Sequence, residues 1–456
     1  MRFDTIFTEK RVGSDKIPSG PRSGFQRDFD RLIFSSAFRR LQNKTQVFPL
    51  PGTAFVHNRL THSLEVASVG RSLGKIIGEQ IAAMYRDQED VHEFYRYELA
   101  NVIAAGCLAH DIGNPAFGHS GEKAISAYFI DNANTEMEGR KLREFFSDKE
   151  WSDLISFEGN ANAVRILTHS FRGRFKGGFG LTYTTIASIL KYPCESVAVD
   201  KKYRHRKKYG FFQTEKETVR KIAEDLGMIV ESEEPLIYRR HPFVYLVEAA
   251  DDICYSIVDM EDAHRLGILR KEEVEGAFME VIRSIDPDGA DRTYGYYSDI
   301  EDTNEALAFL RARIINQLVN QSAAVFLDNR DAIIRGDFNQ TLVGVINQTY
   351  RSLETVEEIS VKKIYGHETV MQIEVAGYNV MSELLQLFVP ALLRTKPTHK
   401  EEKLLQLFPY QFTEHELTRS SYKKVMSALD FISGMTDEYA TEMYRRLKGI
   451  VIPHHG

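Results

Sequence analysis

The chain has 456 residues, with 58 lysines and arginines against 65 aspartates and glutamates, and a formal net charge of −7 at pH 7. Apolar residues make up 43% of it and include 28 phenylalanines, so the chain can bury a large core and global disorder is excluded. One segment departs from the acidic average, because residues 201–208 (KKYRHRKK) carry six formal positive charges in eight positions.

Features that would place the chain outside the cytoplasm are missing from the sequence. The three cysteines, Cys107, Cys194 and Cys254, lie far apart and form no CxxC pair, which argues against a disulfide framework and a zinc knuckle. The first residues lack the apolar core of a signal peptide, and no run of about 18 apolar residues occurs. We therefore expect a cytoplasmic protein with no membrane partner.

Helical periodicity dominates the chain, and strand-like alternation is scarce, so an all-α fold with a few short β-hairpins is predicted. In chain order, we expect a hairpin at 44–49, helices over about 60–84 and 99–111, a hairpin within 227–238, and helices over about 242–258, 306–326 and 370–393. Gly113-Asn114-Pro115 should end the second helix, and Pro242 should lie in the first turn of the third.

The turn-rich segment 286–291 (DPDGAD) breaks this helical pattern. It is the predicted boundary between a catalytic core with an N-terminal extension, over 1–285, and a helical C-terminal region, over 286–456. That C-terminal region is expected to complete the substrate pocket or to build contacts between subunits.

Several common catalytic motifs are missing. Gly74-Lys75 is followed by Ile76 rather than by Ser or Thr, so there is no Walker A loop. His92 and His415 each precede a glutamate but have no second histidine at HExxH spacing, and no G-x-S-x-G elbow occurs. A P-loop ATPase, a zinc peptidase of this type and a serine hydrolase therefore have no support.

A different group of polar residues lies within apolar helical patterns. His110 and Asp111 stand at the end of one predicted helix, and His62 lies on another. Asp251 and Asp252 lie in the middle of a third, where ionised carboxylates are costly unless they are paired or bound to a metal. Two imidazoles and two carboxylates form a mixed ligand set that suits a catalytic divalent ion with open coordination positions.

The third helix offers two alternative polar faces. Asp251, Tyr255 and Asp259 follow one another at four-residue spacing and line one face, which would fit a metal at one end and a sugar hydroxyl at the other. Glu248 and Asp252, together with the same Tyr255 and Asp259, form a competing face. Spacing alone does not decide which of the adjacent aspartates is the metal ligand.

The arrangement of His62, His110-Asp111 and Asp251 matches the H…HD…D pattern of the HD phosphohydrolase superfamily. Longer strings resemble the deoxyguanosine triphosphate triphosphohydrolase family, namely FRRLQNKTQVF (38–48), NRLTHSLE (58–65), AHDIGNP (109–115) onward to Glu122, FEGNA (157–161) and EAADDICY (248–255). The resemblance covers roughly residues 20–265 and is looser after about residue 285. It implies a multi-helical HD-domain core.

The resemblance also implies an activity. The four residues of the H…HD…D pattern would hold one divalent ion per active site (Mg²⁺, Mn²⁺, or else Fe, Co or Ni), with Asp251 rather than Asp252 as the ligand. Deoxynucleoside triphosphates (dNTPs), dGTP and others, would be hydrolysed to deoxynucleoside and intact triphosphate by attack of a metal-bound water on the α-phosphorus. His119 would act as acid or base there, oriented by Glu122.

Further residues are implied at the triphosphate. Arg59 and Lys44 are candidate clamps, with Asn160 a weaker one, because a triphosphate carries too much charge for one ion to neutralise. A solvated loop lysine is the alternative for Lys44. Lys191-Tyr192 either reaches the phosphates or forms a surface pair at the end of a helix.

Other residues are implied at the nucleoside. Gln42 would lie near the sugar and base, or would only satisfy backbone groups. Tyr255 would pack on the sugar and disfavour a ribose, and Asp259 would accept a hydrogen bond from the 3′-hydroxyl.

The basic run 201–208 has four readings: a solvated mobile loop, a lid over the triphosphate, a dNTP effector site between subunits, or a contact with single-stranded DNA. Tyr203, Tyr209, Phe211 and Phe212 interleave with or follow the charges, as a stacking platform for bases requires. The resemblance further implies a homo-oligomer, most often a hexamer. Two alternative functions remain: another HD phosphohydrolase (a nucleotidase or phosphodiesterase), and a nucleic-acid-binding regulatory HD protein.

Overall fold

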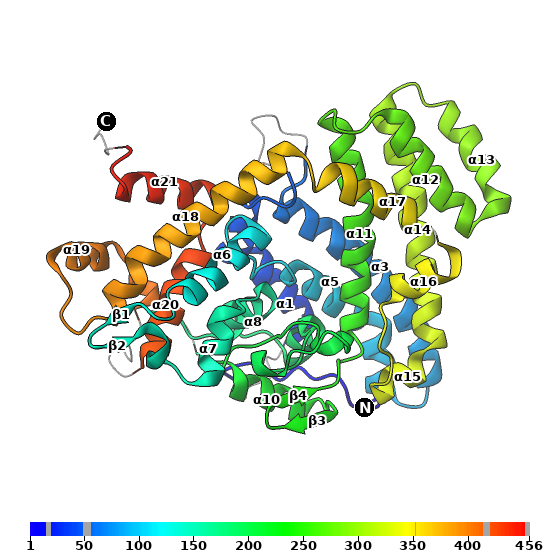
Figure 1. Ribbon diagram of the computed structural model, residues 1–456. Coiled ribbons are helices and arrows are strands. Elements are labelled where there is room, and N and C mark those ends of the chain that lie inside the picture. Colours follow the sequence, from blue (N-terminus) through cyan, green and yellow to red (C-terminus); the bar gives the residue numbers. More distant parts are fainter. Residues whose placement is uncertain (15–19, 49–55, 175, 352, 414–419, 452–456) are drawn as a thin grey trace.

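The computed structural model describes residues 1–14, 20–48, 56–174, 176–351, 353–413 and 420–451 (Figure 1). Its α-helices are α1 Gly24–Ile33, α2 Ser36–Arg40, α3 Arg59–Met84, α4 Glu89–Glu93, α5 Leu99–Ala109, α6 Gly118–Asp131, α7 Asp148–Ile155, α8 Gly159–Thr168, α9 Tyr183–Ile189, α10 Lys216–Asp225, α11 Val244–Arg265, α12 Lys271–Ile285, α13 Pro287–Ser298, α14 Thr303–Asp328, α15 Arg330–Arg335, α16 Leu342–Tyr350, α17 Glu354–Ile359, α18 Glu368–Leu393, α19 His399–Leu407, α20 Ser421–Ser433 and α21 Asp437–Leu447.

Short 3₁₀ and π segments and four strands complete the fold. The former are η1 Leu41–Asn43, η2 Phe94–Glu98, η3 Leu142–Phe145, η4 Ser196–Ala198, η5 Arg204–Arg206, η6 Ser360–Ile364 and η7 Tyr410–Phe412, and the strands are β1 Glu136–Met137, β2 Arg140–Lys141, β3 Val230–Glu233 and β4 Leu236–Tyr238. The all-α class predicted from the sequence is confirmed. None of the helices in the described ranges is both long enough and apolar enough to cross a membrane.

The hairpin predictions had mixed outcomes. Strands β3 and β4 pair antiparallel within the predicted 227–238 segment, whereas β1 and β2 form a hairpin that the sequence pattern did not indicate. The hairpin predicted at 44–49 is wrong for the described residues 44–48, because Thr45 forms only an isolated bridge with Asn58. Residue 49 lies outside the described residues.

The five predicted helices correspond to α3, α5, α11, α14 and α18, and two local expectations are wrong. Helix α11 begins at Val244 with Phe243 at its N-cap, so Pro242 precedes the helix instead of lying in its first turn. The turn-rich segment 286–291 starts helix α13: the Asp286 side chain accepts a hydrogen bond from the Gly289 N–H, and Pro287 occupies the first helical position. The division of the chain near residue 285 stays a prediction.

Gly113 serves a different purpose from the expected helix stop. Helix α5 already ends at Ala109, and Gly113 is not among the glycines with positive φ. A Cβ on Gly113 would lie 2.0 Å from the carbonyl oxygen of Gly159 and 2.2 Å from the nitrogen of Ala163, both in α8. Glycine is therefore required by the close packing of α8 against this loop.

Two hydrophobic clusters fill the interior. The larger one joins α3, α5, α11 and α14 through residues such as Ile103, Ile257 and Leu310, and the second joins α6, α18 and α20 through residues such as Ile125 and Leu384. In Figure 1 the long helix α18 (gold) crosses over α6, with α19–α21 toward one end of the molecule and α12–α14 at the other. The C-terminal helices therefore pack directly on elements that carry predicted catalytic residues.

His57 joins the start of α3 to α11. Its backbone N–H donates to Asp262 Oδ2 (2.8 Å), its ring Nδ1 lies 2.9 Å from Asp262 Oδ1, and its Nε2 lies 3.1 Å from Glu65 Oε1. Burial alone would lower the pKa of His57, but the hydrogen bonds and charges of these two carboxylates raise it to about 10. The ring is therefore an imidazolium ion that links two of the helices bearing metal-ligand candidates.

This ion pair predicts a pH-dependent contribution to stability. A group whose pKa is higher in the folded state stabilises that state fully below its unfolded pKa, near 6.5, and the contribution is lost as the pH rises through about 10. We expect the difference in free energy of unfolding between wild type and His57→Gln to be largest at pH 6 and to shrink toward pH 10. Urea unfolding of both proteins across this range measures it, and a difference that grows with pH would contradict the charged state of His57.

Candidate active site

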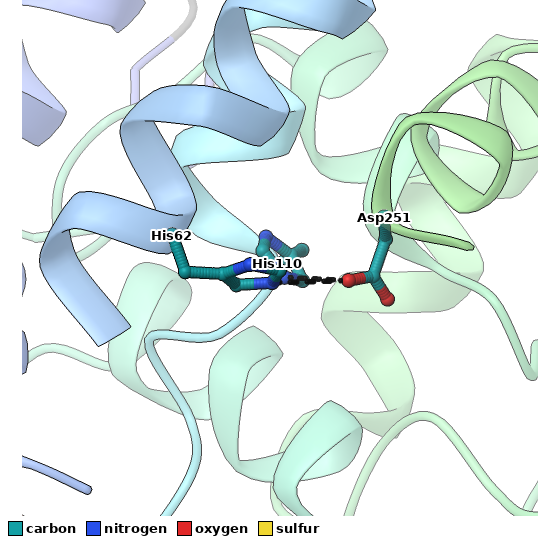
Figure 2. Close-up of side chains that lie close together, drawn as sticks. All are labelled: His62, His110 and Asp251. Carbon is teal, nitrogen blue, oxygen red and sulfur yellow. Dashed lines mark hydrogen bonds and ion pairs between the residues drawn. The ribbon is translucent and has the colours of Figure 1, made fainter. Parts of the chain in front are cut away.

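Three candidate metal ligands converge from three helices (Figure 2). His62 comes from the first turn of α3, His110 from the C-cap of α5, and Asp251 from the middle of α11. Each offers a donor atom within 4.8 Å of the other two. Asp251 Oδ1 lies 3.2 Å from His62 Nε2 and 3.4 Å from His110 Nε2. The sequence prediction that these three residues lie together is thus reflected in the geometry.

The hydrogen bond of His110 Nδ1 leaves its Nε2 available to a metal ion. Its Nδ1 lies 2.6 Å from the carbonyl oxygen of Cys107, which can only accept, so Nδ1 carries the hydrogen. Nε2 is buried and has no hydrogen-bond partner among the described residues. Burial alone would lower the pKa of His110, but Asp111 and Asp251 raise it to about 9. Because a ligand histidine must be neutral, a divalent ion would compete with this proton, and the donor set fits such an ion.

Asp111 lies beside the other three residues. Its Oδ2 accepts a hydrogen bond from Arg59 (2.7 Å), its Oδ1 accepts one from Asn114 (2.5 Å), and Oδ1 is 3.6 Å from His110 Nε2. Burial would raise the pKa of Asp111, but the Arg59 guanidinium and the nearby histidines hold it below its usual value. Asp111 is therefore a carboxylate fixed by two donors at the edge of the group, and its role as fourth ligand stays a prediction.

Three of the candidate ligands, His110, Asp111 and Asp251, line a cavity of about 600 Å³, whereas His62 lies outside its wall. Eight of the residues predicted from the sequence line it: Arg59, His110, Asp111, His119, Glu122, Asn160, Asp251 and Tyr255. Residues from many other segments complete the wall: Thr45–Val47, Asn114, Phe117, Gly118, Ser120, Glu158, Gly159, Lys191, Tyr192, Lys207, Lys208, Asp252, Tyr365, Val370, Ile373 and Glu374. The volume falls within the range of nucleotide-sized ligand sites.

His119 and Glu122 form a dyad on the first turn of α6. Nδ1 of His119 lies 2.8 Å from Glu122 Oε2, and Glu122 Oε1 accepts a hydrogen bond from the Gly159 N–H at 2.7 Å. Burial would raise the pKa of Glu122, but the hydrogen bonds and charge of His119 keep it below its usual value. The His119 side chain is 72% exposed, so its ring faces the open cavity while Glu122 orients it from below.

Three candidate substrate residues, Gln42, Lys44 and the buried Asp259, are not part of the cavity wall. Gln42 is exposed and does not contribute to the cavity wall. Lys44 is buried, and its Nζ donates to the carbonyl oxygens of Asn114 (2.6 Å) and Ser433 (2.9 Å). Burial lowers the pKa of Lys44 to about 7. The alternative of a solvated loop lysine is therefore wrong, and Lys44 ties segments together behind the wall, so its role as a triphosphate clamp stays only a prediction.

The nucleoside candidates on α11 are joined by a residue that the sequence analysis did not single out. Tyr365, at the end of η6, donates a hydrogen bond from its hydroxyl to Asp259 Oδ2 (2.9 Å). Its ring stacks on Tyr255, with centroids 5.9 Å apart and planes at 17°. Burial raises the pKa of Asp259 to about 7. No motif surrounds Tyr365, so only the fold brings it to α11.

The structure shows where the polar residues on the two alternative faces of α11 lie. Asp251, Asp252 and Tyr255 all line the cavity, but only Asp251 belongs to the group of three donors. Glu248 forms a buried ion pair with Arg240, whose NH1 lies 2.8 Å from Glu248 Oε2. Asn160, the weaker clamp candidate, donates its side-chain amide to Glu158 at 2.6 Å.

The end of the basic run lies at the cavity. Lys207 and Lys208 are in its wall, and Lys208 Nζ lies 2.8 Å from Glu158 Oε2. His205 and Arg206 both contact Glu231, at 2.7 Å and 3.0 Å, so this part of the run is held by ion pairs. The reading as a solvated loop is therefore wrong for His205, Arg206 and Lys208, whereas Lys207 is exposed.

The stacking platform predicted with the basic run is also wrong for three of its four rings. Tyr209, Phe211 and Phe212 are each at most 1% exposed and belong to the hydrophobic clusters, and only Tyr203 is exposed. These three rings therefore pack in the hydrophobic core, and they are not available to stack on bases. Lys191 and Tyr192, by contrast, line the cavity, so the reading as a surface pair is wrong.

Two family models match separate parts of the chain. The HD domain model matches residues 59–192, and the phosphohydrolase-associated domain model matches residues 343–446. The chain is 37% identical to a deoxyguanosinetriphosphate triphosphohydrolase-like protein of Synechocystis sp., over 99% of this chain and 100% of the relative. It is 37% identical to one of Pseudomonas aeruginosa (98% and 99%) and 31% identical to a deoxyguanosinetriphosphate triphosphohydrolase of Klebsiella pneumoniae (93% and 94%).

Proposed function

The chain belongs to the HD-domain family of deoxyguanosinetriphosphate triphosphohydrolase-like proteins and is a phosphohydrolase, and on this premise we propose that it hydrolyses dNTPs. The substrates would include dGTP, and the products would be the deoxynucleoside and intact inorganic triphosphate. A homo-oligomeric state and activation by a nucleotide or by single-stranded DNA stay predictions.

One observation carries this proposal: metal-ligand candidates and several cationic side chains face the same cavity. Arg59, Lys191, Lys207 and Lys208 line it together with His110 and Asp251. A nucleoside triphosphate carries close to four negative charges, of which one divalent ion neutralises only half. Cations placed around the ion therefore supply what the phosphate chain needs beyond it.

The chemistry required is attack of a water oxygen on the α-phosphorus with cleavage of its bond to the 5′-oxygen. A divalent ion held by the histidine and aspartate donors supplies Lewis acidity, which lowers the pKa of a water molecule and polarises the phosphoryl oxygen. His119 would move a proton at this centre; its contact with Glu122 through Nδ1, which leaves Nε2 for the substrate, supports this role. Arg59 would bind a phosphate while keeping Asp111 in place.

The sugar end of the cavity is consistent with a deoxynucleoside. Tyr255 and Tyr365 line the cavity with their rings stacked, and the Tyr365 hydroxyl donates to Asp259, which is buried next to them and is not part of the wall. A sugar packed on the Tyr255 ring would leave little room for a 2′-hydroxyl, and its 3′-hydroxyl would have to share Asp259 with the Tyr365 hydroxyl. Such packing would favour deoxynucleotides over ribonucleotides.

The decisive experiment identifies the products. Protein incubated with dGTP and Mg²⁺ or Mn²⁺ should yield deoxyguanosine and triphosphate, separated by ion-exchange chromatography. Formation of dGMP with pyrophosphate, or of dGDP with phosphate, would assign cleavage to another bond. The same assay with each dNTP, alone and in pairs, reports base preference and activation, and an absence of turnover with every dNTP would overturn the proposal.

A variant in the dyad tests the proposed proton transfer. His119→Ala should lower kcat by roughly 100- to 10,000-fold, the usual contribution of a general acid or base, with unchanged metal content. His399→Ala is the matched control, because its side chain is 85% exposed on α19. Retention of full activity by His119→Ala would remove this residue from the mechanism while leaving the product assignment intact.

A further inference from the structure

The segment between α20 and α21 contacts two loops of the cavity wall. Asp437, the first residue of α21, is buried, and its Oδ2 accepts the Thr45 N–H at 2.8 Å while its Oδ1 accepts the Phe117 N–H at 2.9 Å. Both Thr45 and Phe117 line the cavity. One carboxylate from the C-terminal region therefore holds two backbone segments that are 72 positions apart from each other in the sequence.

A second tie runs through the same segment. Lys44, next to Thr45, donates from Nζ to the carbonyl oxygens of Ser433 and Asn114. Asn162 of α8 donates to the carbonyl oxygen of Gly113 at 2.7 Å and lies 3.3 Å from the Ser433 hydroxyl. The loop that leads from the metal-ligand candidates to α6 is thus joined to residues 433–437 directly at Phe117, and through Lys44 and Asn162 at residues 113–114.

Phe117 has a backbone conformation that needs such support. It is the N-cap of α6 and has a φ of 60°, a left-handed conformation that costs a bulky residue free energy unless its surroundings enforce it. Its side chain offers no capping hydrogen bond to the helix. The Asp437 hydrogen bond to its N–H is one of the contacts that oppose this strain.

Helix α18 holds the ring of Phe117 from the other side. A Cβ built on Gly377 would lie 2.5 Å from Phe117 Cβ and 2.5 Å from its Cγ, so only glycine allows this approach. Two elements of the C-terminal region, α18 and the start of α21, therefore meet at the same residue. His119 follows Phe117 by two positions, so the direction in which the dyad enters the cavity depends on this junction.

We propose that Asp437 is a positioning residue for the His119–Glu122 dyad: its carboxylate fixes the strained Phe117 backbone to the 44–47 segment and thereby sets how His119 faces the α-phosphate. The hydrogen bonds of Asp437 with Thr45 and Phe117 are given by the geometry, whereas the expected effect on turnover rests on the proposed function. The neighbouring Glu438 is exposed in the same helical turn and makes a matched control.

The test compares Asp437→Asn with Glu438→Gln, which remove the same charge from the first turn of α21. Asp437→Asn should lower kcat for dNTP hydrolysis by about 10- to 100-fold with KM changed less than about threefold, since a displacement near 1 Å costs about this much. Metal content should be unchanged. Hydrogen–deuterium exchange should accelerate in peptides covering 44–48 and 113–121, and Glu438→Gln should match wild type in every measurement.

A second variant keeps the test decisive if Asp437→Asn folds poorly. Gly377→Ala leaves Asp437 untouched but displaces Phe117, and it should lower kcat and accelerate exchange in 113–121. The positioning role would be overturned if the variants exchanged hydrogen at the wild-type rate in these peptides. It would also be overturned if they exchanged faster but kept the wild-type kcat. If wild-type protein releases no triphosphate, the proposed function fails separately, because the exchange measurement reports the Asp437 contacts without turnover.

Discussion

Replacing His110 with alanine is expected to abolish tight metal binding and to lower dNTP turnover by at least about 1,000-fold, which corresponds to roughly 4 kcal/mol of activation free energy. The physical reason is that the substitution removes the buried Nε2, which faces Asp251 Oδ1 at 3.4 Å and has no hydrogen-bond partner in the described part of the chain. Metal content measured by mass spectrometry, together with the rate of triphosphate release, checks both parts of this expectation.

The control for this prediction is His399→Ala, which makes the same chemical change at an exposed position. It should retain the wild-type metal content and rate. The comparison with His119→Ala is equally informative, because that variant should keep its metal and lose only turnover. A His110→Ala protein with full metal content and full activity would remove His110 from the ligand set.

Replacing Arg165 with methionine is expected to cost roughly 3–5 kcal/mol of folding free energy, because it leaves buried carboxylates without their counter-ion. Arg165, in α8, is 1% exposed and pairs with both oxygens of Asp430 in α20 at 2.7 Å. Its NH1 also donates to Glu215 Oε1 at 2.9 Å. Thermal melting should show a fall in Tm of roughly 3–10 °C for a protein of this size.

Two comparisons separate this buried network from ordinary surface pairs. Arg335→Ala breaks a pair with Asp337 in which both side chains are 63% exposed, and it should change Tm very little. Adding Asp430→Asn to Arg165→Met should recover part of the loss, since it removes one uncompensated charge. Equal melting temperatures for Arg165→Met and Arg335→Ala would contradict a stabilising role for the network.

The sequence predicted the parts of the site that depend on helical periodicity. His62, His110 and Asp251 each lie at a polar position within a strongly apolar helix, and burial of three such helices against one another brings their polar positions together. The spacing of His119 and Glu122 likewise places both on one turn of a helix, which the structure forms as α6.

The remaining residues could not be placed from the sequence because tertiary contacts decide their positions. Tyr365 and Asp437 lie far along the chain from the HD pattern, in segments without a recognisable motif. Only tertiary packing brings Tyr365 to the cavity wall beside α11, and Asp437 to the backbone of Thr45 and Phe117. The prediction of a turn at Asp286-Pro287 was wrong for a local reason. Aspartate before proline is typical both of turns and of helix starts, and here it starts α13.

The contacts of Asp437 with Thr45 and Phe117 have a consequence during synthesis of the protein. A ribosome completes the metal-ligand candidates once residue 251 has emerged, but roughly 190 further residues must follow before Asp437 can reach its two N–H partners. At a bacterial-like elongation rate of about 5–20 residues per second, this interval lasts roughly 10–40 seconds. His62, His110 and Asp251 are thus all synthesised well before Asp437, and the Phe117 N–H lacks its carboxylate partner until translation is nearly finished.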